Sequence, residues 1–398
     1  MKQKNEEILD NVFDKFLTGK TIIKDPTVLN NDYIPNKLPF REKQIVSVGQ
    51  SLALILKGNK CSNLLLYGKT GTGKTVVARY VTKKLLERAD SIKLTIAYSN
   101  TRISNTEYRI LLDLANSINL DIPFTGLSIG EVFKRLSTHI AQKKIFVVFI
   151  LDEIDYFVKK YGDNLLYDLT RSNENLNPGF LSVIGISNDL NFKEYLNPRV
   201  LSSLSEEEIV FPPYSAAEIK SILEQRTNVA FEQESISQGA INLCSALAGS
   251  EHGDARRAVD LLRIAAEVAE REGANRLEEN HIRIAVQKIE RDKIYIALKS
   301  LPLQQKTLLL SISETKQNCT TGDVYENYES ISKKIGIETL TQRRISSMIS
   351  ELDLLGLITA NVVSHGRYGR TKKIKKIKNH EHAIKEVFKQ DQILSILL

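Results

Sequence analysis

The sequence contains few cysteines and no long apolar run. Its longest strongly apolar run, residues 145–151, is seven residues long, whereas a membrane-spanning helix needs about 20 apolar residues. The first residues mix lysines with glutamates and lack the apolar core of a signal peptide. The three cysteines are far apart in the chain, which excludes a disulfide framework or a zinc knuckle and fits small buried thiols in a reducing cytosol. We therefore expect a cytoplasmic protein with no membrane partner.

Neither disorder nor a fibrous fold fits the composition. Hydrophobic residues make up 42% of the chain and charged residues 26%, which is typical of a folded globular protein. With 398 residues, the chain is too long for one compact core, and we expect two or three domains.

Positive charge is concentrated in a short C-terminal stretch. The net charge of the chain is +7, and residues 341–378 alone contain nine lysines and arginines against two acidic residues. Such a local positive field attracts polyanions, of which nucleic acid is the usual one. A solvated charged surface is the alternative, and charge by itself leaves both interpretations open.

Hydrophobic periodicity in the first half of the chain indicates alternating strands and helices. Short apolar runs predict strands, and apolar residues at helical spacing predict helices between them. Fully apolar strands that alternate with helices indicate an α/β fold with a parallel sheet covered on both faces. The predicted strands are residues 63–67, 92–98, 145–151 and 182–186, and the predicted helices are residues 41–56, 75–88, 106–119 and 128–142.

Proline signals divide the rest of the chain. After Pro212 and Pro213 only helical patterns occur, and after Pro302 three shorter helical stretches lead into a basic hairpin. Three helices followed by a hairpin are the plan of a winged helix-turn-helix domain. We therefore expect an α/β core with an N-terminal arm (1–210), an all-helical domain (211–298) and a winged-helix domain (299–398).

Residues 68–75 carry the strongest chemical signal. Their sequence, Gly-Lys-Thr-Gly-Thr-Gly-Lys-Thr, fits the P-loop pattern G-x-x-x-x-G-K-[ST] and lies between an apolar strand and a helix. The glycines let backbone N–H groups face phosphate oxygens, and the helix N-terminus adds the positive end of its dipole. Lys74 is expected to reach the β/γ-phosphates of ATP, and Thr75 to offer its hydroxyl to Mg²⁺. The expected nucleotide contacts of this segment are Gly68, Gly71, Thr72, Gly73, Lys74, Thr75 and Val76.

Polar residues follow two of the predicted strands. Asp152 and Glu153 come after the strand at 145–151, where adjacent carboxylates are costly unless a cation neutralises them. We expect Asp152 to hold Mg²⁺ through a water molecule, near the Thr75 hydroxyl, and Glu153 to polarise the attacking water. Asn188, after the strand at 182–186, can orient that water, although asparagine is also common in turns.

Two arginines are candidates for stabilising charge on the γ-phosphate. Arg199 lies between the predicted core and the proline hinge, and Arg256 begins a predicted helix of the all-helical domain. A guanidinium near a γ-phosphate stabilises the transition state of phosphoryl transfer strongly. Spacing alone leaves open that both are ordinary surface arginines.

Together these motifs resemble those of the AAA+ ATPases. The segment 33–41, Tyr-Ile-Pro-Asn-Lys-Leu-Pro-Phe-Arg, is more closely similar to the archaeal origin-recognition initiators, the cell division control protein six homologues. The motifs shared with the AAA+ ATPases include Pro-Arg-Val-Leu-Ser-Ser-Leu around Arg199 and Gly-Asp-Ala-Arg, which ends at Arg256, and the resemblance spans about residues 10–378. It implies adenine-side contacts for Tyr33 and Arg41, sensor 1 for Asn188, an arginine finger acting on a neighbouring subunit for Arg199, lid contacts to ATP for Tyr214 and Arg226, and sensor 2 for Arg256.

The basic C-terminal stretch coincides with the predicted recognition helix and wing. One face of the helix at 341–355 is apolar, and Arg343, Arg344 and Ser347 point elsewhere, toward DNA in this interpretation. Lysines of the wing can contact backbone phosphates, and a narrow Tyr-Gly tip between two arginines suits the minor groove. The expected DNA contacts of the wing are Arg367, Tyr368, Gly369, Arg370, Lys372 and Lys373.

The resemblance implies a DNA replication initiator. Such a protein binds double-stranded origin DNA as an ATP/ADP switch with slow ATPase turnover, helps recruit and load the replicative helicase, and can act with initiator paralogues at the nucleoid. Two other functions fit the same domains. One is an ATP-gated transcription regulator that uses the winged helix at promoters. The other is a signalling ATPase whose winged helix contacts protein instead of DNA.

Overall fold

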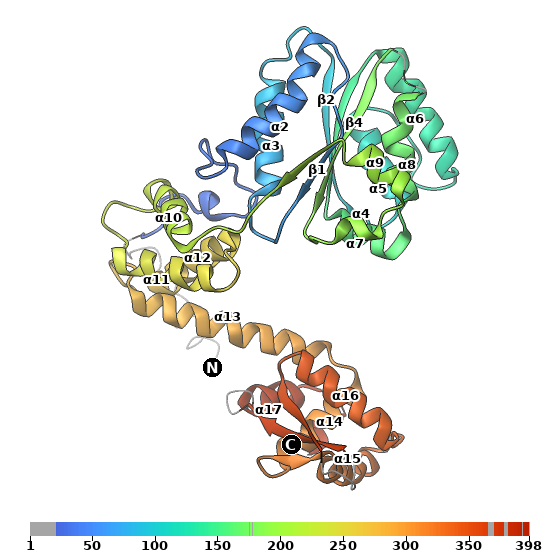
Figure 1. Cartoon of the computed structure of the whole chain (residues 1–398). Coiled ribbons are helices and arrows are strands. Elements are labelled where there is room, and N and C mark those ends of the chain that lie inside the picture. Colours follow the sequence, from blue (N-terminus) through green and yellow to red (C-terminus); the bar gives the residue numbers. More distant parts are fainter. Residues whose placement is uncertain are drawn as a thin grey trace, which may run out of the picture. The chain divides into compact units, whose positions relative to one another are not determined.

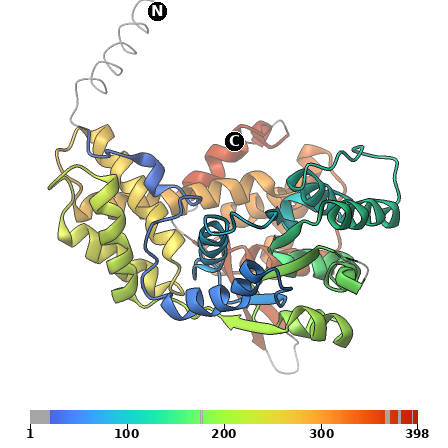
Figure 2. The same cartoon turned by 90° about the horizontal axis from the view of Figure 1, so that it is seen from above.

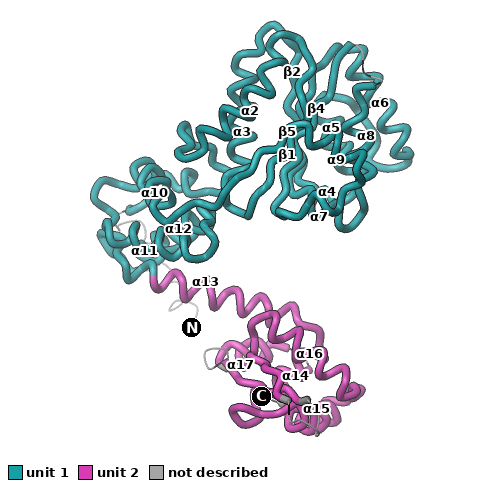
Figure 3. Tube along the Cα trace, in the orientation of Figure 1, with its two compact units in different colours: residues 1–282 teal, residues 283–398 magenta. Residues whose placement is uncertain are grey.

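Two compact units make up the chain, Met1–Ile282 and Arg283–Leu398 (Figure 3). The structure is a computed structural model that describes residues 21–174, 176, 178–364, 370–377, 381–391 and 393–397. The division between the units falls inside one helix, α13 (Glu279–Ser300).

The first unit is built on a five-stranded parallel sheet in the order β2-β3-β4-β1-β5 (Figure 1). All four predicted strands are present, and the second runs two residues later than expected. Strand β5 was not predicted, because only Ile209 of its four residues is buried and no apolar run marks it. The strands are β1 (Leu64–Tyr67), β2 (Leu94–Asn100), β3 (Phe146–Asp152), β4 (Phe180–Ser187) and β5 (Glu207–Val210).

Helices cover both faces of this sheet, as the fully apolar strands predict (Figure 1). Strand β4 is buried along its whole length, which requires apolar partners on either side. One face packs on α2 (Glu42–Ala53) and α3 (Lys74–Leu86). The other packs mainly on α5 (Glu107–Ser117), α6 (Ile129–Lys143), α7 (Ile154–Tyr161), α8 (Asn164–Arg171) and α9 (Pro198–Leu204), and the single-turn helix α4 (Thr101–Ser104) follows β2.

An all-helical bundle completes the first unit after the proline pair. Ser215 and Glu218 form a capping box, which starts the first helix directly after the prolines. Figures 1 and 2 show the three helices gathered beside the sheet, and they contact one another pairwise. The helices are α10 (Ala216–Ala230), α11 (Gln238–Ser250) and α12 (Ala255–Glu272).

The second unit has the predicted winged-helix arrangement. Among the described residues, its core joins apolar side chains from the end of α13, from the four α-helices that follow it and from a small antiparallel sheet in the order β6-β8-β7. The short strand β6 and the last helix, α17, were not predicted. The elements are α14 (Leu303–Glu314), β6 (Cys319–Thr320), α15 (Thr321–Ile335), α16 (Gln342–Leu354), β7 (Ile358–Ser364), β8 (Arg370–Lys376) and α17 (Glu381–Lys389).

The fold confirms the predicted class: a parallel-sheet α/β core, a helical lid and a C-terminal winged helix. The three cysteines are all buried, as their scattered positions suggested. Across the described residues, no helix combines the length and the apolar character that a membrane span requires.

Candidate functional site

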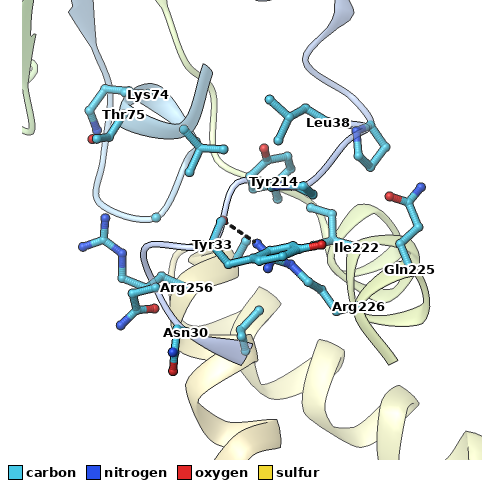
Figure 4. Close-up of a pocket in the computed structure, with 18 of the residues that line it drawn as sticks. Asn30, Tyr33, Leu38, Lys74, Thr75, Tyr214, Ile222, Gln225, Arg226 and Arg256 are labelled. Atoms are coloured by element: carbon cyan, nitrogen blue, oxygen red, sulfur yellow. Dashed lines mark hydrogen bonds between the residues drawn. The ribbon is translucent and has the colours of Figure 1, made fainter. Parts of the chain in front are cut away.

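One cavity of about 490 Å³ lies in the first unit, between the sheet edge and the helical bundle (Figure 4). Its walls come from the N-terminal segment, the P-loop, the ends of β3 and β4, and helices α10 and α12. It therefore unites segments that are far apart in the sequence. Of the predicted site residues, it is lined by Tyr33, Gly71, Gly73, Lys74, Thr75, Val76, Asp152, Glu153, Asn188, Tyr214, Arg226 and Arg256.

Four of the residues predicted for the nucleotide site do not line the cavity. Arg41 is buried behind the P-loop, where its guanidinium donates hydrogen bonds to the carbonyls of Thr72 (2.9 Å) and Pro212 (2.7 Å). Thr72 is itself fully buried and bonds to the carbonyl of Lys69. The remaining two are Gly68, packed against the backbone of Phe211, and Arg199, exposed on α9.

Lys74 is held inside the loop that it follows. Its ammonium donates to the carbonyls of Gly68 (2.8 Å) and Lys69 (2.7 Å), and only 4% of the residue is exposed. Burial lowers the pKa of Lys74 to about 8, although the nearby Asp152 carboxylate opposes this shift. A partly desolvated cation at the mouth of a glycine-rich loop is suited to binding phosphate oxygens.

Glycines in the loop permit close contact with the helical bundle. A Cβ on Gly71, whose φ is +69°, would lie 1.7 Å from Oδ1 of Asp254, the N-cap residue of α12. The N–H of Ala255 donates to the carbonyl of Gly71 at 3.2 Å. A Cβ on Gly73, with φ +92°, would lie 2.8 Å from the Tyr214 hydroxyl. The loop and the first turn of α12 thus touch directly, and the positive φ of both glycines disfavours any residue with a Cβ at these positions.

Asp152 is 6% exposed and accepts three hydrogen bonds. Its Oδ2 accepts from the hydroxyls of Thr75 (2.8 Å) and Tyr98 (3.1 Å), and its Oδ1 accepts from the N–H of Glu153 (2.9 Å). Burial raises the pKa of the Tyr98 phenol to about 12, with the Asp152 charge adding to the shift, so Tyr98 remains a donor at neutral pH.

A hydroxyl and a carboxylate side by side are the hard oxygen ligands that Mg²⁺ prefers. Thr75 and Asp152 therefore fit this ion. No cluster of three or more His, Cys, Asp or Glu side chains suited to a metal occurs in the described part of the chain. Water and the phosphates of a nucleotide would have to complete the coordination of Mg²⁺, which is the usual arrangement for this ion.

Glu153 stands at a strained turn after β3. Its φ of +56° is unusual for a residue with a Cβ, and Thr101 fixes the turn by donating to the carbonyls of Asp152 (3.0 Å) and Glu153 (2.8 Å). An arginine, Arg102, lies 3.7 Å from the Glu153 carboxylate. The backbone N–H of Asn188 donates to Asp155 at 3.0 Å, which fixes the end of β4 at the same rim.

Tyr33 and Arg226 form the opposite end of the cavity. The guanidinium lies 4.5 Å from the centre of the Tyr33 ring and donates to the Tyr33 carbonyl at 3.4 Å, the bond dashed in Figure 4. It also donates to the carbonyl of Val28 at 2.5 Å. Burial lowers the pKa of Arg226. Figure 4 also shows Arg256 reaching from α12 toward the loop that carries Lys74 and Thr75.

Sequence reasoning missed several residues of this site. Tyr98 touches Asp152 across neighbouring strands, and an apolar strand pattern gives no sign of that contact. The wall formed by α10 includes Ile222, Gln225 and Val229, of which Val229 is half exposed. Their spacing of three and four places them on one helix face, which is a usable signal only once the neighbouring elements are known.

The proposed recognition helix, α16, exposes the three side chains singled out from the sequence. Arg343, Arg344 and Ser347 are exposed, whereas Ile345 and Ile349 are buried in the core of the second unit. The Arg344 guanidinium lies 3.9 Å from Glu351, an exposed pair that stabilises the helix only weakly.

Lysines of β8 alternate between two environments. The ammonium of Lys372 donates to the carbonyl of Ser346 at 2.6 Å and to the hydroxyl of Ser350, both on α16. Lys373 and Lys375 are exposed on the other face of the strand. The Lys372 ammonium is thus engaged with α16 in this structure, and its contact with DNA stays a prediction. Arg370 begins β8, and Arg367, Tyr368 and Gly369 lie outside the described residues.

Three family models match separate parts of the chain. An AAA domain matches residues 57–190, the Cdc6 AAA+ ATPase-type lid domain matches residues 220–287, and the C-terminal winged helix domain of CDC6 matches residues 296–387. These matches cover the P-loop core, the helical bundle and the second unit.

Curated relatives align over almost the whole chain. An ORC1-type DNA replication protein 1 from Sulfurisphaera tokodaii is 45% identical over 395 residues, covering 98% of this chain and 99% of the relative. An ORC1-type DNA replication protein from Pyrococcus abyssi is 47% identical, covering 98% and 95%. The solved structure of the Aeropyrum pernix ORC1 protein in complex with DNA superposes with a TM-score of 0.81 at 42% identity, covering 95% of this chain and all of that one.

Proposed function

Because this chain belongs to the family of ORC1-type DNA replication proteins, we propose that it is a replication initiator that binds origin DNA. In this proposal it acts as an ATP/ADP switch at the nucleoid and helps recruit and load the replicative helicase, alone or with paralogues of its family. The three functional segments are the core with its arm (1–210), the lid (211–298) and the winged-helix domain (299–398).

A single observation carries the nucleotide part of the proposal. Lys74 from the P-loop, Asp152 from β3 and Arg256 from the lid line one cavity. We assign the phosphates to Lys74 and the loop, and Mg²⁺ to Thr75 and Asp152. When bound, the ion neutralises phosphate charge and holds the phosphates in place. Tyr33 and Arg226 lie at the other end, where the base would bind, and Arg41 supports the loop from behind.

Hydrolysis requires a water molecule aligned with the γ-phosphate. We assign Glu153 as the proton acceptor for that water and Asn188 as the residue that orients the water. Arg256 of the lid would stabilise the charge on the γ-phosphate. Arg199 is exposed and outside the cavity of its own chain, which supports its assignment as a finger for a neighbouring subunit. Turnover by an isolated chain should therefore be slow and leave ADP bound.

DNA binding is assigned to the second unit. The relative from Aeropyrum pernix, solved in complex with DNA, has the same fold at 42% identity. Exposed Arg343, Arg344 and Ser347 of α16 are suited to base edges in the major groove, and exposed Lys373 is suited to phosphates. The wing tip at residues 367–370 remains the proposed minor-groove contact.

Genome-wide binding of this protein in its own host, compared with mapped replication start sites, tests the function. An initiator predicts few, clustered sites at replication starts, whereas a transcription regulator predicts dispersed promoter sites. Purified protein that fails to bind duplex DNA at low salt, with or without ATP, would contradict both and favour a signalling ATPase.

A further inference from the structure

Tyr98 of β2 donates its phenol hydrogen bond to the carboxylate oxygen of Asp152 that Thr75 also contacts. We propose that Tyr98 is a positioning residue for the metal-binding carboxylate: it fixes Oδ2 of Asp152 so that a divalent cation and its nucleotide meet a carboxylate already in place. The inference rests on the proposed function, since it concerns the same Mg²⁺ site.

The strand register brings the two side chains together. Asn100 is the direct neighbour of Asp152 on the adjacent strand, and Tyr98 lies two residues earlier on β2, opposite Ile150. Side chains two residues apart lie on the same face of a strand. Tyr98 is therefore on the face that carries the Asp152 side chain and that packs against α3, from which Thr75 reaches the same oxygen.

Tyr98 is itself held from the opposite side. The guanidinium of Arg79, on α3, lies 4.2 Å from the centre of the Tyr98 ring, and Arg79 is 3.6 Å from Asp32 of the N-terminal segment. The ring is thus confined between α3 and β3, which leaves its hydroxyl little freedom to turn from Asp152. The Asp32 carboxylate is 94% exposed, so the stacking of Arg79 contributes more to this confinement than the ion pair does.

A fixed carboxylate matters because its orientation decides which lone pair faces the ion. Thr75 must keep an oxygen lone pair available for Mg²⁺ while its hydrogen points at Asp152, and this is possible only with Oδ2 in a defined place. A second donor on Oδ2 lowers the entropy lost when the cation binds. Without Tyr98, Asp152 would keep the Thr75 contact alone on that oxygen.

The test measures cation affinity instead of turnover. Full-length protein, freed of nucleotide, is titrated with Mn²⁺ in the presence of ADP, and free Mn²⁺ is followed by electron paramagnetic resonance. Tyr98→Phe keeps the ring and its contact with Arg79 but removes the donor. We expect Mn²⁺ affinity to fall roughly tenfold, as for loss of one hydrogen bond to a charged group. ADP affinity in EDTA should be unchanged.

Tyr108→Phe is the matched control, because it removes a phenol hydrogen bond to the carbonyl of Pro123 (2.5 Å) from a residue that does not line the cavity. It should leave Mn²⁺ affinity unchanged. The proposal is overturned if Tyr98→Phe alters Mn²⁺ affinity less than about twofold, or weakens ADP binding in EDTA as much as in Mn²⁺. Wild-type protein that binds no Mn²⁺ with ADP would instead overturn the proposed function itself.

Discussion

The guanidinium of Arg41 lies 3.7 Å from the centre of the Tyr214 ring. Arg41 precedes the first helix of the core and Tyr214 precedes the first helix of the lid, so the contact joins the N-terminal arm to the hinge. Arg41 also donates to the carbonyl of Thr72 inside the P-loop. This arginine therefore connects the arm, the loop and the hinge from behind the cavity.

Arg41→Ala should destabilise the first unit. Removing the buried guanidinium leaves the carbonyls of Thr72 and Pro212 without their donor, at a cost of about 3 kcal/mol in the free energy of unfolding measured in urea. Arg135→Ala is the control, because Arg135 forms an exposed ion pair with Glu131, and its loss should cost less than about 0.5 kcal/mol. Equal losses for the two variants would contradict a structural role for Arg41.

Gly71→Ala should abolish the contact between the loop and α12. Its Cβ would overlap the Asp254 carboxylate, and its φ of +69° disfavours any residue with a Cβ. Strain of about 1–3 kcal/mol at this position should lower ADP affinity by about 5- to 150-fold, as measured with a fluorescent nucleotide. Gly130→Ala, on α6 with no atom within 4 Å of the new Cβ, should instead keep ADP affinity and add up to about 1 kcal/mol of helix stability.

Metal-free ADP binding should weaken above pH 8. Burial lowers the pKa of Lys74 to about 8 in the nucleotide-free protein, and bound phosphates favour its charged form. Lys74 therefore stays protonated in the complex with ADP but loses its proton in the free protein. ADP affinity should fall as pH rises, by at most about tenfold per pH unit. Titrations at several pH values in EDTA measure this slope. In Lys74→Arg the side chain stays charged, so ADP affinity should not change with pH. A slope equal to that of the wild type would show that another group causes the pH dependence.

The free energy of unfolding should also depend on pH through Lys74, but it should rise with pH where ADP affinity falls. Because the pKa of Lys74 is lower in the folded chain than its ordinary value of 10.5, the unfolded chain binds more protons between about pH 8 and 10.5. Stability of the nucleotide-free protein should rise with pH across this window relative to Lys74→Met, when both are followed by urea unfolding. If the difference in free energy of unfolding between the wild type and Lys74→Met stays constant across this pH range, the pKa of Lys74 is not lowered.

Substitutions at Lys372 and Lys373 should distinguish the loss of a phosphate contact from the loss of a structural contact within the second unit. Lys373→Ala removes an exposed charge and should reduce the salt dependence of affinity by about 0.9 in log–log slope if it contacts one phosphate. Lys372→Ala removes the donor to Ser346 and Ser350 and should lower both the stability of the second unit and DNA affinity, with the slope unchanged. Fluorescence anisotropy at several salt concentrations measures the DNA affinity and its salt dependence for each variant. Equal changes in the log–log slope would indicate that both lysines contact phosphates.

Local patterns predicted a large part of the fold and of the cavity. Sequence patterns predict the P-loop, the acidic end of β3 and the apolar strands correctly, because each of these features depends on residues that are close in sequence. The signals are hydrophobic periodicity, glycine positions and the polar residues at strand ends. Strand β5 was missed because its edge position requires only one buried side chain. Helix α17 was missed because no proline or glycine signal marks its start.

What the sequence alone determined is the set of chemical groups and the order of the elements that carry them. Tertiary structure decided which groups share a space. Arg41 lies behind the loop and bonds to Thr72, Tyr98 contacts Asp152 from a strand position 54 residues away, and Lys372 bonds to α16 while Lys373 faces solvent. The physical reason is that burial and hydrogen-bond partners of a polar side chain depend on strand register and helix packing, which bring together residues that no local pattern relates.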